Sequence, residues 1–273
     1  MKSASEKLWR RSEGLAERLL RHVVPIFRGN GARNQQSHGT GFLISNSADS
    51  FLISAAHVFD PMESGTDLFF YTGHKRILRL PGQQICRTTP PAGRNRSADC
   101  LDVGVLRLEK TVSPPYPEVN KETLPINALL PRALPRERKP YLLTGFPGSK
   151  TQLHRARRQV EAKPYANWST SASKAAYGRV RCDAQNHIVM PFNRRRVMGA
   201  RSAIRAFPNP AGMSGSPLWL LPDVNGTNDP TQTPVVGVFI EYHSARHLLV
   251  ATDISVALDM INRGSYGRKL VTA

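Results

Sequence analysis

Apolar residues in this sequence come in short runs, and Gly, Pro, Asn, Asp and Ser separate one run from the next. Short strands divided by turns are typical of barrels or sandwiches, whereas βαβ proteins alternate their strands with long helices. We therefore expect an all-β fold. The predicted strands cover residues 23–27, 40–44, 51–54, 68–71, 103–108, 141–145, 178–182, 188–191, 217–220, 235–240 and 248–252.

A helix is predicted at each end of the chain. Residues 4–22 place Leu15 and Leu19 on one helical face, so this segment should pack on the main body. Near the other end, Asp253 can cap a helix and Gly264 lies where that helix would stop. Prolines recur between about residues 113 and 140, which suits a linker between two halves.

The composition allows a large core. The chain has 273 residues, of which 40% are hydrophobic, and this suffices for one large unit or two barrels of about 100 residues each. Its three cysteines are an odd number in a chain too long to need disulfide staples, which favours a reduced, cytoplasmic setting. No run resembles a signal-peptide core or a membrane span of roughly 20 apolar residues, so we expect a soluble protein that does not bind membranes.

Three segments carry residues suited to acyl transfer. In the first, a buried-looking strand runs through Ser54-Ala-Ala and presents His57; in the second, Asp102 comes directly before a strand. In the third, glycines flank Ser214 within Gly212-Met-Ser-Gly-Ser-Pro217, so that backbone N–H groups can converge beside its hydroxyl. Each has an ordinary alternative, namely a structural histidine, a solvated turn acid and a simple Gly/Ser/Pro turn. Together they supply base, orienting acid and nucleophile.

These motifs, in the order His, Asp, Ser, resemble the trypsin/chymotrypsin-like serine proteases, especially their bacterial and stress-protease branch, as a standalone catalytic domain. Two further motifs agree with this resemblance. Gly39-Thr-Gly-Phe resembles the family's strand before the histidine, and Val236-Gly-Val-Phe resembles the family's strand along the substrate cleft. The resemblance covers roughly residues 22–263 and implies a chymotrypsin-like double β-barrel. The expected parts are an N-terminal helical extension (1–22), a first barrel with His and Asp (23–112), a Pro-rich crossover (113–140), a second barrel with Ser (141–253), and a C-terminal helix and tail (254–273).

The resemblance implies a serine endopeptidase that acts on protein or peptide substrates without a cofactor. His57, Asp102 and Ser214 would form the triad, and backbone N–H groups of the loop Gly212-Met213-Ser214, chiefly those of Gly212 and Ser214, the oxyanion hole. Met213 stands where trypsin-type zymogens carry an Asp, so activation by a newly cut N-terminus is not expected.

The resemblance also bears on specificity. Pro208 lies at the expected base of the primary pocket, where an Asp would select Arg or Lys, so trypsin-like cleavage is not expected. Val238 and Ile240 are expected pocket walls, and small or medium apolar side chains the expected preference.

Basic residues outnumber acidic ones, 38 Lys and Arg against 20 Asp and Glu, a net charge of +18. Such a surplus can bind nucleic acid or an acidic protein by counterion release, or simply solvate loops. The densest basic stretches comprise Arg132, Arg136, Arg138, Lys139, Lys150, Arg155, Arg157 and Arg158, and then Arg194, Arg195, Arg196, Arg201 and Arg205.

Two functional alternatives stay open. One is a catalytically silent protease-fold protein that binds such a partner, and the other is an esterase with the same triad.

A metal site is not expected. His243 and His247 are expected in a hairpin, and no zinc motif occurs.

Overall fold

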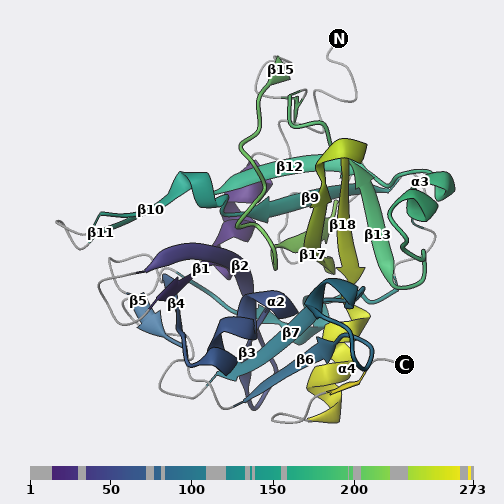
Figure 1. The fold of residues 1–273 in the computed structure, drawn as a ribbon. Helices are drawn as coiled ribbons and strands as arrows, with labels where there is room; N and C mark the ends of the chain where they lie inside the picture. The colour runs from purple at the N-terminus through teal and green to yellow at the C-terminus, as the bar shows by residue number, and fades with distance from the viewer. Residues whose placement is uncertain are drawn as a thin grey trace.

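A computed structural model describes residues 14–29, 35–71, 77–80, 84–108, 121–132, 136, 139–154, 159–195, 197–198, 204–221, 233–264 and 270–271. Within these residues the chain forms two curled, largely antiparallel sheets, one in the lower and one in the upper half of Figure 1. The expected all-β fold with two halves is confirmed.

The first sheet is built mainly from the N-terminal half of the chain. Its strand order is β19-β6-β7-β3-β2-β1-β4-β5, and β8 pairs with β2 outside this path. Strand β3 therefore lies between β2 and β7, which places the segment before His57 beside the segment after Asp102. The strands are β1 (Val23–Gly29), β2 (Gln36–Ser45), β3 (Ser50–Ala55), β4 (Asp67–Tyr71), β5 (Ile77–Arg79), β6 (Ile85–Thr89), β7 (Val103–Leu108), β8 (Leu124–Pro125) and β19 (Leu270–Val271).

The second sheet comes from the C-terminal half and has the order β12-β9-β16-β17-β18-β13. Two small ribbons accompany it, β10 with β11 and β14 with β15. Strand β16 follows Ser214 directly and pairs with β9 and β17. The strands are β9 (Pro140–Gly145), β10 (Thr151–His154), β11 (Gln159–Ala162), β12 (Tyr165–Thr170), β13 (His187–Pro191), β14 (Val197–Met198), β15 (Ile204–Arg205), β16 (Pro217–Leu220), β17 (Val235–His243) and β18 (Leu248–Asp253).

The helices are short and lie between strands or at the two ends. Residues 14–19 are helical and run into the 3-10 turn η1 (Leu20–His22), while the start of the predicted 4–22 helix lies outside the described residues. The C-terminal helix α4 (Ser255–Arg263) is confirmed and ends at Gly264 in a left-handed conformation, φ 60°. The others are α2 (Ala56–Phe59), η2 (Asp60–Ser64), η3 (Arg96–Ala98), η4 (Ile126–Ala128), η5 (Gly148–Lys150), α3 (Lys174–Arg179) and η9 (Ser244–Arg246).

The predicted strand at 178–182 is wrong, because this segment is the end of α3 and the turn after it. Ala176, Tyr177 and Val180 follow a helical spacing and are buried against Leu248 and Val250 of β18. This packing against the second sheet selects the helix over the strand.

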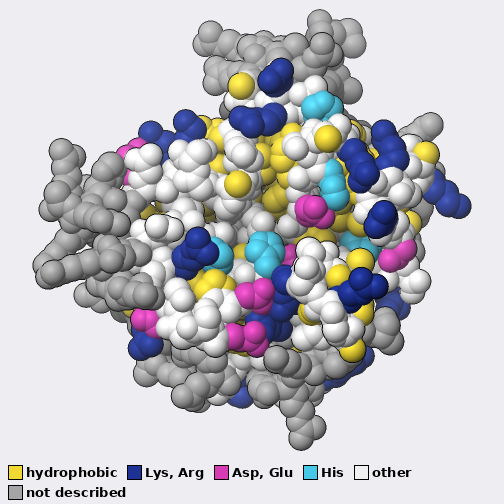
Figure 2. All heavy atoms as spheres, viewed as in Figure 1, with side chains coloured by type: hydrophobic (Ala, Val, Ile, Leu, Met, Phe, Trp, Pro, Cys, Tyr) yellow, Lys and Arg dark blue, Asp and Glu magenta, His cyan; other side chains and the backbone are white. Residues whose placement is uncertain are grey.

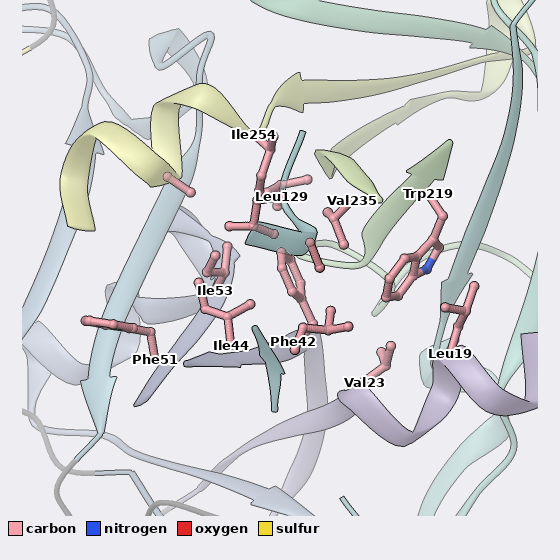
Figure 3. Close-up of a cluster of buried hydrophobic side chains, with 14 of the residues drawn as sticks. Leu19, Val23, Phe42, Ile44, Phe51, Ile53, Leu129, Trp219, Val235 and Ile254 are labelled. Atoms are coloured by element: carbon pink, nitrogen blue, oxygen red, sulfur yellow. The ribbon is translucent and has the colours of Figure 1, made fainter. Parts of the chain in front are cut away.

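One hydrophobic cluster joins the two sheets and both terminal helices (Figure 3). Phe42 and Ile53 enter it from the first sheet and Trp219 from the second, and Leu19 and Ile254 enter it from the ends of the chain. The indole N–H of Trp219 donates to Thr144 Oγ1 at 2.9 Å, so its one polar atom is satisfied inside the core. Each fully buried side chain of this size contributes roughly 1.5–3 kcal/mol. The two halves therefore share a hydrophobic core.

The crossover is described only from residue 121 onward. There, β8 pairs with β2 of the first sheet, and Leu129 forms an isolated bridge with Val235 of the second. The residue limits of the parts 1–22, 23–112, 113–140, 141–253 and 254–273 stay a prediction. Among the described helices, none combines the length and the apolar character needed to cross a lipid bilayer.

Candidate active site

His57 lies in the short helix α2, which begins as β3 ends. Gly104 on the neighbouring strand makes this turn possible, since a Cβ atom there would lie 2.6 Å from the Phe59 ring. The backbone N–H of His57 donates to Asp102 Oδ1 at 2.9 Å, and Nδ1 lies 2.5 Å from Asp102 Oδ2. About a third of the imidazole side chain, 35%, is exposed. The ring is thus held on one edge by Asp102.

Asp102 is buried and has an unusual backbone conformation, φ 43°, in the left-handed region that non-glycine residues seldom adopt. Its carbonyl oxygen accepts from the N–H of Ala56 at 2.9 Å, which ties it to the start of α2. Burial alone would lower the pKa of His57, but the hydrogen bond and charge of Asp102, with a further contribution from Asp60, raise that pKa above its ordinary value. Asp102 thus stabilises the protonated imidazole.

Ser214 lies in a loop that needs two left-handed glycines, Gly212 at φ 89° and Gly215 at φ 90°. A Cβ atom at Gly215 would lie 2.8 Å from the Ala55 amide nitrogen and would overlap the Thr40 carbonyl oxygen. The carbonyl of Ser214 accepts from the N–H of Thr40 at 2.9 Å. Because Ala55 and Thr40 belong to the first sheet, these contacts bring the partly exposed Ser214 to the strand end that carries His57.

Two backbone amides of this loop, those of Gly212 and Ser214, have no hydrogen-bond acceptor among the described residues. The N–H of Met213 donates to Pro210 O at 2.8 Å, and its side chain is fully buried, so Met213 supports the loop from inside. Thr40 Oγ1 donates to Gly212 O at 2.9 Å and fixes the loop from the opposite side. Unpaired amides beside a hydroxyl are the arrangement that stabilises a negatively charged oxygen.

The expected specificity residues have different surroundings. Val238 has no exposed surface and belongs to the shared hydrophobic cluster, and its expected place in a pocket wall stays a prediction. Pro208 and Ile240 keep some exposure, Ile240 only 8%. Phe207, next to Pro208, stacks edge-to-face on Phe192 with ring centroids 5.3 Å apart. The region around Pro208 is therefore apolar and aromatic.

Ser216 lies two residues after Ser214, and the structure shows how its side chain is accommodated. Its side chain is fully buried, and a Cβ atom at Gly145 would overlap its Oγ and lie 3.1 Å from its Cβ. Gly145, on β9, thus leaves the room that Ser216 occupies.

Figure 2 shows the face that carries the candidate site, with several histidine side chains gathered between the upper and lower halves. One histidine near His57 was not predicted as a site residue. His38 lies close enough to His57 to feel its charge, and burial, with the charges of Arg28 and His57, lowers the pKa of His38 to about 4. No motif surrounds His38 in the sequence, so only the pairing of the strands reveals this neighbour.

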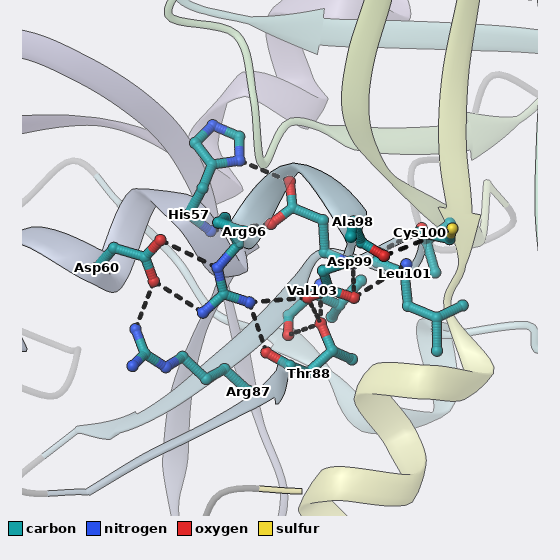
Figure 4. A network of polar contacts seen from close by, with 12 residues as sticks. His57, Asp60, Arg87, Thr88, Arg96, Ala98, Asp99, Cys100, Leu101 and Val103 are labelled. Carbon is teal, nitrogen blue, oxygen red and sulfur yellow. Dashed lines mark hydrogen bonds and ion pairs between the residues drawn. The ribbon is translucent and has the colours of Figure 1, made fainter. Parts of the chain in front are cut away.

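Polar residues behind the triad were also missed. Asp60, Thr88, Arg96 and Asp99 form hydrogen bonds and ion pairs that reach from α2 to the loop before Asp102 (Figure 4). Asp99 and Asp102 are three residues apart, which is the one sequence signal that could have indicated a carboxylate pair.

Other histidines and cysteines lie away from His57. His22 and His187 are buried, and His22 Nδ1 lies 3.0 Å from Glu122 O while His187 Nε2 lies 2.8 Å from Cys100 O. Cys100 is exposed. His243 and His247 lie in the β17–β18 hairpin as predicted. Among the described residues, no group of His, Cys, Asp and Glu side chains could hold a metal ion.

No protein-family model and no curated protein sequence matches this chain. Among solved structures, neuropsin, a serine protease expressed in the limbic system of mouse brain, aligns with a TM-score of 0.57 and 13% identity over 88% of this chain and 92% of neuropsin. A chain from a study of the coupled folding and binding of the intrinsically disordered Sesbania mosaic virus VPg protein aligns with a TM-score of 0.49 and 13% identity over 90% of this chain and 92% of that one. The likeness to neuropsin shows the fold alone, a chymotrypsin-like double β-barrel.

Proposed function

We propose that this protein is a serine endopeptidase whose triad is His57, Asp102 and Ser214. The observation that carries the proposal is the buried Asp102 carboxylate 2.5 Å from His57 Nδ1, next to a loop with a serine between two left-handed glycines. Base, orienting acid and nucleophile are the complete set for acyl transfer. The double-barrel fold supports this function, because Asp102 is hydrogen-bonded to His57 and the carbonyl of Ser214 accepts from Thr40 of the same sheet.

In the proposed mechanism, Ser214 Oγ attacks the scissile carbonyl while His57 accepts its proton. Asp102 fixes the imidazole tautomer through Nδ1 and stabilises the imidazolium that forms. The free N–H groups of Gly212 and Ser214 donate to the developing oxyanion. His57 then gives its proton to the leaving amine, and water repeats the sequence to release the acyl group. No cofactor takes part.

The specificity we propose is not trypsin-like. Pro208 offers no charge to an Arg or Lys side chain, and the ring of the neighbouring Phe207 packs edge-to-face on Phe192. Small or medium apolar side chains are therefore the preferred residues before the cleaved bond. A cleavage profile from a peptide library checks this, and a profile dominated by Arg or Lys would contradict it.

The triad is tested by Ser214→Ala, with Ser64→Ala as the matched control because Ser64 is an exposed serine of η2. We expect Ser214→Ala to lose several orders of magnitude in kcat and all labelling by a fluorophosphonate. Ser64→Ala should retain both. Labelling and peptide hydrolysis that persist in Ser214→Ala would refute the assignment, and turnover of esters without peptides would identify the protein as an esterase.

The three cysteines fit a reduced compartment. Cys86, Cys100 and Cys182 are free thiols in the structure. Val58, beside His57, fills the space over Gly39, where a Cβ atom would lie 2.7 Å from its methyl carbons. Hydrophobic packing thus holds this corner together without a disulfide. We propose a cytoplasmic location on this basis.

A further inference from the structure

Asp99 is a second buried carboxylate behind the triad, with its side chain only 1% exposed. Its Oδ1 accepts from the N–H groups of Leu101 at 3.2 Å and Asp102 at 3.1 Å. Its Oδ2 accepts from Thr88 Oγ1 at 2.6 Å and from Arg96 Nη1 at 2.8 Å. A buried carboxylate is costly unless its acceptors are filled, and these four donors fill them. Such a charge, if it served only stability, could be replaced by an apolar residue.

The Asp99 cluster holds the backbone of Asp102 on both sides. The N–H of Asp102 donates to Asp99, and the N–H of the next residue, Val103, donates to Thr88 Oγ1 at 3.0 Å. Between these two bonds Asp102 adopts its left-handed conformation, which costs on the order of 1–3 kcal/mol and persists only where the surroundings enforce it. From this conformation the Asp102 carboxylate reaches both His57 N–H and His57 Nδ1.

Arg96 connects this cluster to the helix of the catalytic base. Its Nε and Nη2 donate to the two carboxylate oxygens of Asp60 at 3.0 and 2.9 Å, while Nη1 donates to Asp99 and to Thr88 O (Figure 4). Asp60 follows directly on α2, which carries His57. The Arg96 guanidinium thus links the loop before Asp102 to the end of helix α2, which carries His57.

We propose that Thr88 and Arg96, acting through Asp99, are positioning residues of the triad that hold Asp102 in the conformation from which it orients His57. This inference rests on the proposed function, and it concerns residues that touch neither substrate nor the reacting atoms. The charged or titratable groups that act on His57 are Asp102, Asp60, Arg96 and His38.

The first test compares Thr88→Val with Thr88→Ser. Valine has the shape of threonine but removes the hydroxyl that joins Asp99 to Val103, whereas serine keeps it and changes no charge. We expect Thr88→Val to lower kcat by on the order of 10–100-fold, because the base is misplaced, with KM within about twofold. Thr88→Ser should stay close to the wild type.

The second measurement needs no catalytic turnover. An NMR titration of the His57 ring reports its pKa directly, and contact with Asp102 raises this pKa. In Thr88→Val, the His57 ring should therefore titrate at lower pH than in the wild type, because Asp102 is displaced. In Thr88→Ser, the His57 ring should titrate as in the wild type. This readout separates the inference from the proposed function: a wild type without peptidase activity refutes the function, whereas equal His57 titrations in all three proteins refute the positioning role.

Arg96→Gln provides an independent variant, with Arg94→Gln as its control, because Arg94 is an exposed arginine in the same loop. We expect Arg96→Gln to lower kcat at least tenfold with little change in KM, and Arg94→Gln to leave both unchanged. Denaturation midpoints are measured for every variant to confirm that the compared proteins are folded. A kcat that is unchanged in folded Thr88→Val and Arg96→Gln overturns the proposal.

Discussion

Asp60 influences His57 without belonging to the triad. Its carboxylate raises the pKa of His57, although the ion pairs with Arg87 and Arg96 partly neutralise it. Catalysis requires the neutral imidazole, so the rate rises with pH as His57 loses its proton. Asp60 therefore helps to set the pH at which the proposed enzyme becomes active.

The corresponding prediction is that Asp60→Asn moves the acidic limb of the pH profile of kcat/KM to lower pH. The substitution removes a negative charge that raises the pKa and leaves Arg96, which lowers it, less neutralised, so both effects have the same sign. Asp67→Asn makes the same charge change in a pair with Arg79 on β4 and β5 and should leave the limb in place. A limb that moves to higher pH in Asp60→Asn would contradict this account.

At the residue scale, the sequence predicts residues that belong to a recognisable motif. It misses residues whose role depends on contacts with distant parts of the chain. His57, Asp102 and Ser214 each have a local context that indicates a role, and the proposed site uses them. Thr88 and Arg96 carry no such context, because their partners Val103 and Asp60 are distant in sequence and are brought near only when β6 pairs with β7.

At the scale of elements, the Ser214 loop is tightly constrained. Gly215 combines a positive φ with close backbone neighbours on the first sheet, whereas Gly178 in α3 has open space around it and no positive φ. The two glycines thus differ in what an added methyl group would meet.

We predict that Gly215→Ala destabilises the protein and abolishes fluorophosphonate labelling, since the loop has to move away from Ala55 and Thr40. Gly178→Ala should instead add roughly 0.5–1 kcal/mol of stability, the usual gain from alanine within a helix. Denaturant unfolding and labelling of both variants check this, and a fully labelled Gly215→Ala would show that the loop tolerates the methyl group.

Ten of the eleven predicted strands and α4 are present, because alternating apolar residues and clear turn signals mark them, whereas strands such as β6 and β12 were not predicted. The strand expected at 178–182 failed because Ala176, Tyr177 and Val180 read equally as an apolar run or as one helical face. Their contacts with Leu248 and Val250, far along the chain, decide between the two, and no local pattern contains that information.

At the scale of the whole molecule, the basic surplus is not all on the surface. Arg136 belongs to a basic stretch of the sequence, yet its side chain is 5% exposed and pairs with the fully buried Asp253 at 2.5 Å. It also donates to the backbone carbonyls of His187 and Gln185. Charge counting alone could not separate this buried ion pair from the solvated arginines around it.

We predict that Arg136→Met lowers the free energy of unfolding by about 3–5 kcal/mol, because it leaves the Asp253 carboxylate buried without its partner. Arg21→Met breaks an exposed pair with Glu122, whose side chains are 62% and 59% exposed, and should cost at most about 1 kcal/mol. Guanidinium unfolding of the two variants measures the difference, and equal losses would show that the Arg136 pair adds nothing beyond a surface contact.

The N-terminal helix has a consequence for how such an enzyme could mature. Leu15 and Leu19 are fully buried in the cluster that joins the two sheets, directly before β1 begins at Val23. A processing cut between this helix and β1 would free a segment whose side chains complete the interior. Removing it would open the core that the two sheets share, so we expect this segment to stay with the folded protein and not to be shed as a pro-peptide.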